Sequence, residues 1–339
     1  MTPHSCATAI SYAGGAATGK PGVFNRMRAF AWFLGLVGVA LAAVALFAYP
    51  AWMLLHPHFD FPFHRIGERV GMLALLLGFL TLARHLGLTD RASLGYGLPR
   101  RKFAQEMTLA LALGVTTMLA VVGMMAALGL LEWRAGAPSS AAALAKLLVS
   151  GALSGFAVAF IEETFLRGAM LTAIERESGT RAAELLTAVL YAATHFFGKF
   201  HIPPDQVTPW SGVELLAGTL HAFAHPLAIA DAFLALFAVG IVLGLVRAAT
   251  GSIAACVGLH AGWVWVMLVT HELAAPRADA ALAFLLSRFD GFVGWLVLAW
   301  TVLLAFPVWR FYVARSAAAG KRAAGRGASA PPFRRRRQS

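Results

Sequence analysis

The feature that most limits the fold of this 339-residue chain is a series of long apolar runs that carry few charges. Apolar residues make up 59% of the chain and charged residues 13%, whereas a soluble globular protein carries about 25% charge. About 20 apolar residues cross the hydrocarbon layer of a membrane as a helix, and lipid offers backbone groups no hydrogen-bond partner outside a helix or a closed barrel. We therefore predict an all-α, polytopic transmembrane helix bundle.

The apolar runs predict about eight membrane spans. Their expected ranges are 29–53, 67–86, 104–131, 144–170, 183–200, 227–247, 252–271 and 291–311. Residues 1–25 are polar and predict a disordered cytoplasmic leader, and residues 313–339 predict a disordered basic tail. The transmembrane domain is accordingly expected at 26–312.

The distribution of lysine and arginine predicts the orientation of the chain. Most of the 28 lysines and arginines fall on the side of the N-terminus when eight spans are counted, so both termini are expected in the cytoplasm. The formal charge of +12 gathers at span ends and in the tail run Arg334 to Arg337. That placement predicts anionic lipids as the partner of the tail and no nucleic acid. The Ala- and Arg-rich composition favours a bacterial inner membrane.

Two smaller features carry less information about function. The only cysteines, Cys6 and Cys256, cannot make a disulfide framework. An external loop holds Ser211 and Glu214 at capping-box spacing, followed by apolar residues at helical intervals. The pattern predicts a short helix at 211–223, either lying in the membrane interface or forming an ordinary loop helix.

Charged side chains inside spans are costly and usually functional. The fourth expected span contains Glu162 and Glu163, followed by Arg167. Glu163 and Arg167 lie four residues apart on one helical face in the favourable order for an ion pair. Glu162 points about 100° away and has no such partner. We therefore expect Glu162 to be the catalytic acid or base, with Glu163 and Arg167 in support.

Two histidines in later spans are the other candidates. If the chain turns near Gly179, His195 and Glu162 lie at nearly the same depth on antiparallel helices. His260 follows the turn at Thr250-Gly251 and is expected slightly shallower but within reach. The three side chains predict one polar pocket, although a lone membrane histidine is often only a helix–helix hydrogen bond.

These residues form three motifs that resemble those of the CAAX-protease and bacteriocin-processing family. Glu162-Glu163-x-x-x-Arg167 matches its first motif completely, and Tyr191-x-x-x-His195 matches the second with tyrosine in place of phenylalanine. The third motif, His-x-x-x-Asn, keeps His260 but has Val264 at the amide position. The resemblance covers about residues 144–270.

The resemblance implies an intramembrane endopeptidase that cleaves a membrane-associated peptide or protein. It implies that Glu162 and His195 activate a water and that His260 helps to hold the oxyanion. Val264 cannot donate a hydrogen bond, and loss of one oxyanion donor can cost about 10²–10³ in rate; the Trp263 indole is a candidate substitute. We expect no cofactor; if a metal such as zinc is used, its ligands would be Glu162, His195 and His260.

Other classes of function fit less well but stay open. A proton-coupled transporter also uses intramembrane Glu and His, yet no internal repeat or paired broken helices are evident. A family member without activity would act as a membrane adaptor or immunity factor. His271-Glu272 begins a zinc-protease motif that lacks its second histidine, and the remaining histidines are expected to be structural.

Overall fold

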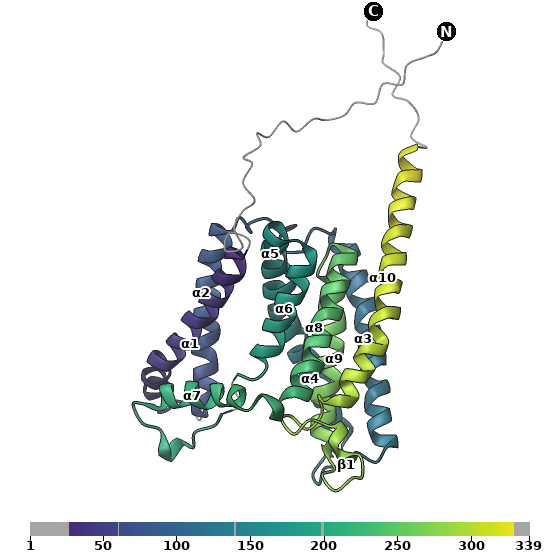
Figure 1. The fold of residues 1–339 in the computed structure, drawn as a ribbon. Coiled ribbons are helices and arrows are strands. Elements are labelled where there is room, and N and C mark those ends of the chain that lie inside the picture. Colours follow the sequence, from purple (N-terminus) through teal and green to yellow (C-terminus); the bar gives the residue numbers. More distant parts are fainter. Residues whose placement is uncertain (1–26, 60, 139, 198–199, 329–339) are drawn as a thin grey trace, which may run out of the picture.

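The computed structural model describes residues 27–59, 61–138, 140–197 and 200–328 as a bundle of long helices that run side by side (Figure 1). The predicted leader 1–25 and the tail run Arg334 to Arg337 lie outside the described residues. Seven helical stretches are long and apolar enough to cross a membrane. The prediction of an all-α polytopic bundle is therefore confirmed.

Ten α-helices follow one another along the described part of the chain. Their bounds are α1 (Arg28–Leu55), α2 (Phe63–His85), α3 (Arg100–Ala127), α4 (Ala141–Glu163), α5 (Leu171–Ser178), α6 (Thr180–Thr194), α7 (Ser211–Ala224), α8 (Ala230–Thr250), α9 (Ala254–Leu273) and α10 (Trp295–Ala328). A π-helical segment, η2 (Thr164–Met170), joins α4 to α5 without a break. Short 3₁₀ turns are η3 (Pro204–Gln206), η4 (Pro226–Ala228) and η5 (Ala283–Leu285).

The expected fifth span, 183–200, differs most from its prediction. It is the 15-residue helix α6, which is shorter than the helices that qualify as spans. Gly179, with φ +82°, ends α5 and lets α6 run back beside it, because glycine tolerates positive φ without strain. The turn expected near Gly179 is thus present, and α6 still passes through the bundle beside α8. The start of α1 and the end of α10 lie toward the same end of the molecule (Figure 1).

Two further elements differ from the prediction. A small antiparallel sheet pairs β1 (Leu131–Trp133) with β2 (Ala274–Pro276) and ties the α3–α4 connection to the chain after α9. Helix α10 continues to Ala328, although disorder was expected from residue 313. Alanine, the residue with the highest helix propensity, is frequent in this stretch, which favours the continuation.

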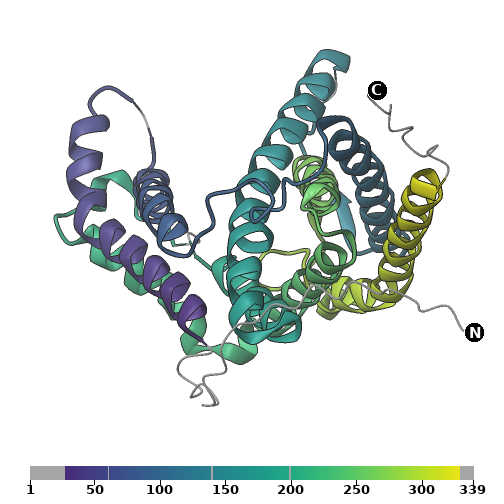
Figure 2. The same cartoon turned by 90° about the horizontal axis from the view of Figure 1, so that it is seen from above.

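Helices α1, α2 and α7 stand to one side of the other helices (Figure 2). One of their contacts with the other helices is Phe165 of η2, whose ring contacts Phe33 of α1 and Phe79 of α2. Helix α7 confirms the helix expected at 211–223, and it lies across the ends of α1 and α2 in Figure 1. Ser211 begins the helix, and its hydroxyl donates to Glu214.

Helix α9 is the most buried of the seven candidate spans, and it packs between α3 and α4. Its contact with α3 depends on glycine. A Cβ atom at Gly114 of α3 would lie 2.5 Å from the carbonyl oxygen of Leu259 on α9. Small residues at such crossings let two backbones approach closely. Since Leu259 precedes His260, this approach also fixes where His260 enters the bundle.

We predict that Gly114→Ala destabilises the protein by about 1–3 kcal/mol through overpacking. The matched control is Gly123→Ala in the same helix, because a Cβ atom there meets nothing within 4 Å. The control should be neutral or slightly stabilising, since alanine is the better helix former. Thermal unfolding in detergent micelles, followed by tryptophan fluorescence, measures both; equal melting temperatures would contradict the prediction.

Candidate active site

The two glutamates lie where α4 changes into the π-helical segment η2. Helix α4 ends at Glu163, and η2 carries Arg167 in a stretch whose residues 166–170 are all buried. Single π-helical turns inside α-helices occur frequently at functional sites. The local backbone therefore changes at the same point as the sequence introduces charge.

Glu163 is the centre of the polar cluster. Its Oε1 accepts a hydrogen bond from Arg167 Nη1 at 3.0 Å and another from His260 Nδ1 at 2.8 Å. The side chains of Glu163 and Arg167 are completely buried. Arg167 also donates to the carbonyl of Gly240 on α8 at 3.3 Å. The predicted Glu163–Arg167 ion pair is thus confirmed, and it connects η2 to α8 and α9.

His260 is oriented by that contact. A carboxylate oxygen can only accept, so Nδ1 of His260 carries the proton in this hydrogen bond. Its other nitrogen, Nε2, faces Oε2 of Glu162 at 3.9 Å. This distance is too long for a direct hydrogen bond. The imidazole therefore lies between two carboxylates, held by one and separated by a gap from the other.

Glu162 lacks a guanidinium or ammonium partner in the described part of the chain, as its spacing predicted. Its side chain is 32% exposed, yet Oε2 is buried and has no hydrogen-bond partner among the described residues. An uncompensated buried polar atom costs free energy. Such an atom at a polar cluster is well placed to meet a water or a substrate.

The charges of the cluster are unequal. It holds the two carboxylates of Glu162 and Glu163 and one guanidinium, that of Arg167, which pairs with Glu163. Since an unpaired charge is costly to bury, Glu162 is the carboxylate that this ion pair leaves uncompensated.

His195 follows the last residue of α6. Its Nδ1 donates to the carbonyl of Tyr191 at 2.7 Å, so in the neutral ring Nε2 is the free acceptor. The ring packs edge-on against Tyr191, with centroids 4.5 Å apart. His195 also lies within electrostatic reach of Glu162 and His260. The structure therefore brings together the residues that the sequence predicted from three separate spans.

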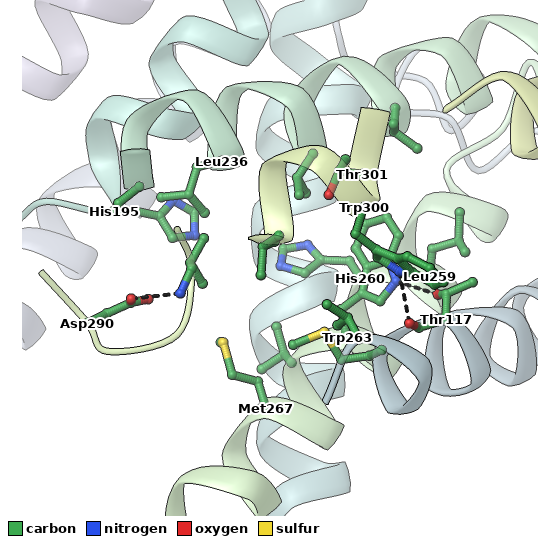
Figure 3. A pocket seen from close by; sticks show the side chains of 18 of the residues that line it. Thr117, His195, Leu236, Leu259, His260, Trp263, Met267, Asp290, Trp300 and Thr301 are labelled. Carbon is green, nitrogen blue, oxygen red and sulfur yellow. Dashed lines mark hydrogen bonds between the residues drawn. The ribbon is translucent and has the colours of Figure 1, made fainter. Parts of the chain in front are cut away.

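Beside the histidines lies a cavity of about 400 Å³ (Figure 3). Side chains of α3, α6, α8, α9, α10 and the loop before α10 line it, and most of them are apolar. His195 and His260 reach it, whereas Glu162 is not among its lining residues. The expectation of one polar pocket is therefore wrong: the charged cluster is compact, and the open space beside it is apolar.

Comparison with known proteins agrees with this geometry. Residues 144–266 match the family described as type II CAAX prenyl endopeptidase, Rce1-like. This segment carries the likeness of the chain to the CAAX-protease family. Neither a curated protein nor a solved structure matches the chain. The matched segment contains both glutamates and Arg167, His195 and His260.

The departure of this chain from the third family motif is visible in the cavity. Val264 lines the cavity and offers no hydrogen-bond donor. The indole N–H of Trp263, considered above as a substitute, donates to Oγ1 of Thr117 at 3.0 Å (Figure 3). Trp263 is therefore engaged in a structural hydrogen bond between α9 and α3.

The residues considered as metal ligands are Glu162, His195 and His260. Among the residues that the structure describes, no group of three or more His, Cys, Asp or Glu side chains is arranged to hold a metal ion. The closest approach recorded between members of this set is the 3.9 Å separation of Glu162 and His260.

Sequence reasoning missed two residues that support the site. Arg247 is only 9% exposed, and its Nε donates to the carbonyl of Arg167 at 3.2 Å. From the sequence, Arg247 is one of the charges at a span end. Only the packing of α8 against η2 reveals its hydrogen bond to the Arg167 carbonyl. Tyr191 places its ring under the Arg167 guanidinium, with Cζ 4.5 Å from the ring centroid. Its aromatic position in the second motif was the available signal.

We predict that Arg167→Met lowers the free energy of unfolding by about 3–5 kcal/mol, because it leaves a buried carboxylate without its counter-ion. The double variant Glu163→Gln/Arg167→Met should be less destabilised than Arg167→Met alone. The control is Arg315→Met, which breaks the half-exposed Arg315–Glu106 pair and should cost less than about 1 kcal/mol. Thermal unfolding in detergent micelles compares the three; an Arg167→Met variant as stable as Arg315→Met would refute this account of the site.

Proposed function

We propose that this protein is an intramembrane endopeptidase that hydrolyses a peptide bond of a membrane-associated peptide or protein. The observation that carries the proposal is the unpaired, buried Oε2 of Glu162, which faces Nε2 of His260 across 3.9 Å. A general base must lie within hydrogen-bond reach of the proton it takes, directly or through one water. One water that hydrogen-bonds both atoms fits a separation of this size.

The reaction would follow from the positions of these groups. Glu162, with His195, removes a proton from the water as its oxygen attacks the carbonyl carbon of the peptide. The carbonyl oxygen becomes negative and accepts a hydrogen bond from Nε2–H of His260. This ring must then carry a proton on both nitrogens, because its Nδ1–H is already donated to Glu163. The proton then passes to the amide nitrogen as the C–N bond breaks. In this scheme the chemistry needs only the side chains of the chain; a zinc ion bound by Glu162, His195 and His260 is the alternative.

The surroundings of the site favour a substrate that enters from the membrane. The cavity beside His195 and His260 is lined mainly by apolar side chains, and apolar cavities with a few polar groups are typical of binding sites. Extended peptide with apolar side chains could occupy this space while its carbonyl reaches the histidines. The family description names prenylated CAAX substrates; we leave the identity of this chain's substrate to the experiment below.

The protein is integral to the membrane, and we propose that it lies in a bacterial inner membrane with both termini in the cytoplasm. The excess of lysine and arginine on that side supports this orientation. Anionic lipids are the proposed partners of the basic tail, and no nucleic acid is expected.

A membrane adaptor without protease activity is the second candidate function. The observation in its favour is Val264, which replaces a hydrogen-bond donor of the family motif and lines the cavity. The two candidates differ in one respect that can be measured: only a protease requires the Glu162 carboxylate.

We predict that Glu162→Gln lowers kcat by about 10²–10⁴, because the amide cannot accept the proton of the water. The purified protein, reconstituted in liposomes, is incubated with a proteome-derived peptide library, and new termini are identified by mass spectrometry. The control is Glu132→Gln, which changes an exposed glutamate on β1 and should cleave like the wild type.

The same comparison in the native host identifies the physiological substrate. Terminal-enriching mass spectrometry of membrane and secreted peptides compares the wild type with a Glu162→Gln strain of equal expression. A terminus that vanishes in this strain and in His195→Ala supports the protease. A knockout phenotype that Glu162→Gln rescues, with no terminus changed, would instead support the adaptor.

A further inference from the structure

Tyr191 carries a hydroxyl that no interaction described so far uses. The side chain lies on α6, is 3% exposed and lines the cavity beside the two histidines. Its backbone carbonyl accepts from His195, but its hydroxyl forms no hydrogen bond with the described part of the chain. The hydroxyls of buried tyrosines usually find a partner. An unpartnered hydroxyl on a residue that lines a cavity is available to a bound molecule.

Most other hydrogen-bond donors around the cavity are already engaged. The indole of Trp263 donates to Thr117 Oγ1, and the indole of Trp300 donates to the Thr117 carbonyl at 3.1 Å (Figure 3). The hydroxyl of Thr301 on α10 also lacks a partner among the described residues. Two hydroxyls therefore remain as free donors, and they come from different walls of the cavity.

Of the two residues with a free hydroxyl, Tyr191 is the one that contacts the charged cluster. The Arg167 guanidinium covers its ring at 4.5 Å from the centroid. The ring of His195 packs on it at 4.5 Å and that of His260 at 5.9 Å between centroids. The hydroxyl also lies within electrostatic reach of Glu162. These contacts fix the ring before any substrate binds, which is the requirement for a donor that stabilises developing charge.

We infer that Tyr191 is an oxyanion donor of the proposed peptidase, hydrogen-bonding through its hydroxyl to the carbonyl oxygen of the scissile peptide. This inference rests on the proposed function. In the step, water adds to the carbonyl carbon, the π-bond electrons move onto the oxygen, and the proton of the water goes to Glu162. Tyr191 keeps its own proton throughout. The hydroxyl on α6 then supplies a second donor beside His260. Val264 on α9, at the amide position of the third motif, offers no hydrogen-bond donor.

The test is Tyr191→Phe, which removes one oxygen atom and leaves the ring in place. We predict that kcat falls by about 10²–10³, the usual cost of one oxyanion donor, whereas KM changes little because the ground-state carbonyl needs the donor less. The substrate is the peptide that the wild type cleaves fastest in the library assay above. Thermal unfolding is measured on the same samples, so that a purely structural effect is recognised.

Two matched controls remove a hydroxyl elsewhere. Tyr312→Phe makes the same change at a fully buried tyrosine of α10 whose hydroxyl also lacks a partner among the described residues and which does not line the cavity. Tyr312→Phe should keep the wild-type kcat. Thr301→Val removes the other free hydroxyl of the cavity and should lower kcat much less than Tyr191→Phe does.

The outcomes separate this inference from the function on which it rests. If the wild type cleaves no peptide, or if Glu162→Gln cleaves as fast as the wild type, the proposed function fails and the inference with it. If Glu162→Gln is inactive but Tyr191→Phe matches Tyr312→Phe, only the inference fails. A loss confined to Thr301→Val would likewise overturn it and assign the donor to α10.

Discussion

The buried carboxylate of Glu163 is the interaction on which the rest of the site depends. It accepts hydrogen bonds from Arg167 on η2 and from His260 on α9, and Arg167 extends the connection to Gly240 on α8. Hydrogen bonds from η2 and α9 thus meet at one oxygen atom, and α8 is joined to them through Arg167. A buried carboxylate is tolerated only when it is paired and hydrogen-bonded. The cost of burying Glu163 therefore fixes how η2, α8 and α9 lie relative to one another.

That constraint gives the two neighbouring glutamates different surroundings. Adjacent residues of a helix point about 100° apart, so only one of them can enter the network of Arg167. Glu163 does so through Oε1, whereas neither oxygen of Glu162 contacts the guanidinium and its Oε2 lies opposite Nε2 of His260. The network also requires a proton on the His260 nitrogen that is bound to Glu163. In the proposed peptidase Glu163 would therefore hold the site together, and Glu162 would act on the water.

The sequence could predict the features that depend on local spacing. The apolar runs located seven of the eight expected spans, and the i, i+4 spacing identified the pair of Glu163 and Arg167. It could not predict features that depend on how helices pack. The π-helical turn at Thr164–Met170, the second contact of Glu163 with His260, and the contact of Arg247 with η2 each need a partner distant in sequence. The shortness of α6, which has 15 residues, was not predicted either, because the apolar run continues beyond the end of the helix.

The separation of charge from open space has a consequence for how such a site could work in a membrane. The ion pair is enclosed by η2, α8 and α9, whereas the cavity of about 400 Å³ is walled mainly by apolar side chains. A polar cavity would hold many waters and lower the strength of each electrostatic interaction. An apolar cavity keeps bulk water away and admits only the atoms that bind there. In the proposed mechanism, hydrogen bonds from His260 and Tyr191 to a substrate oxygen would be stronger in such surroundings, so that a small number of donors would be sufficient.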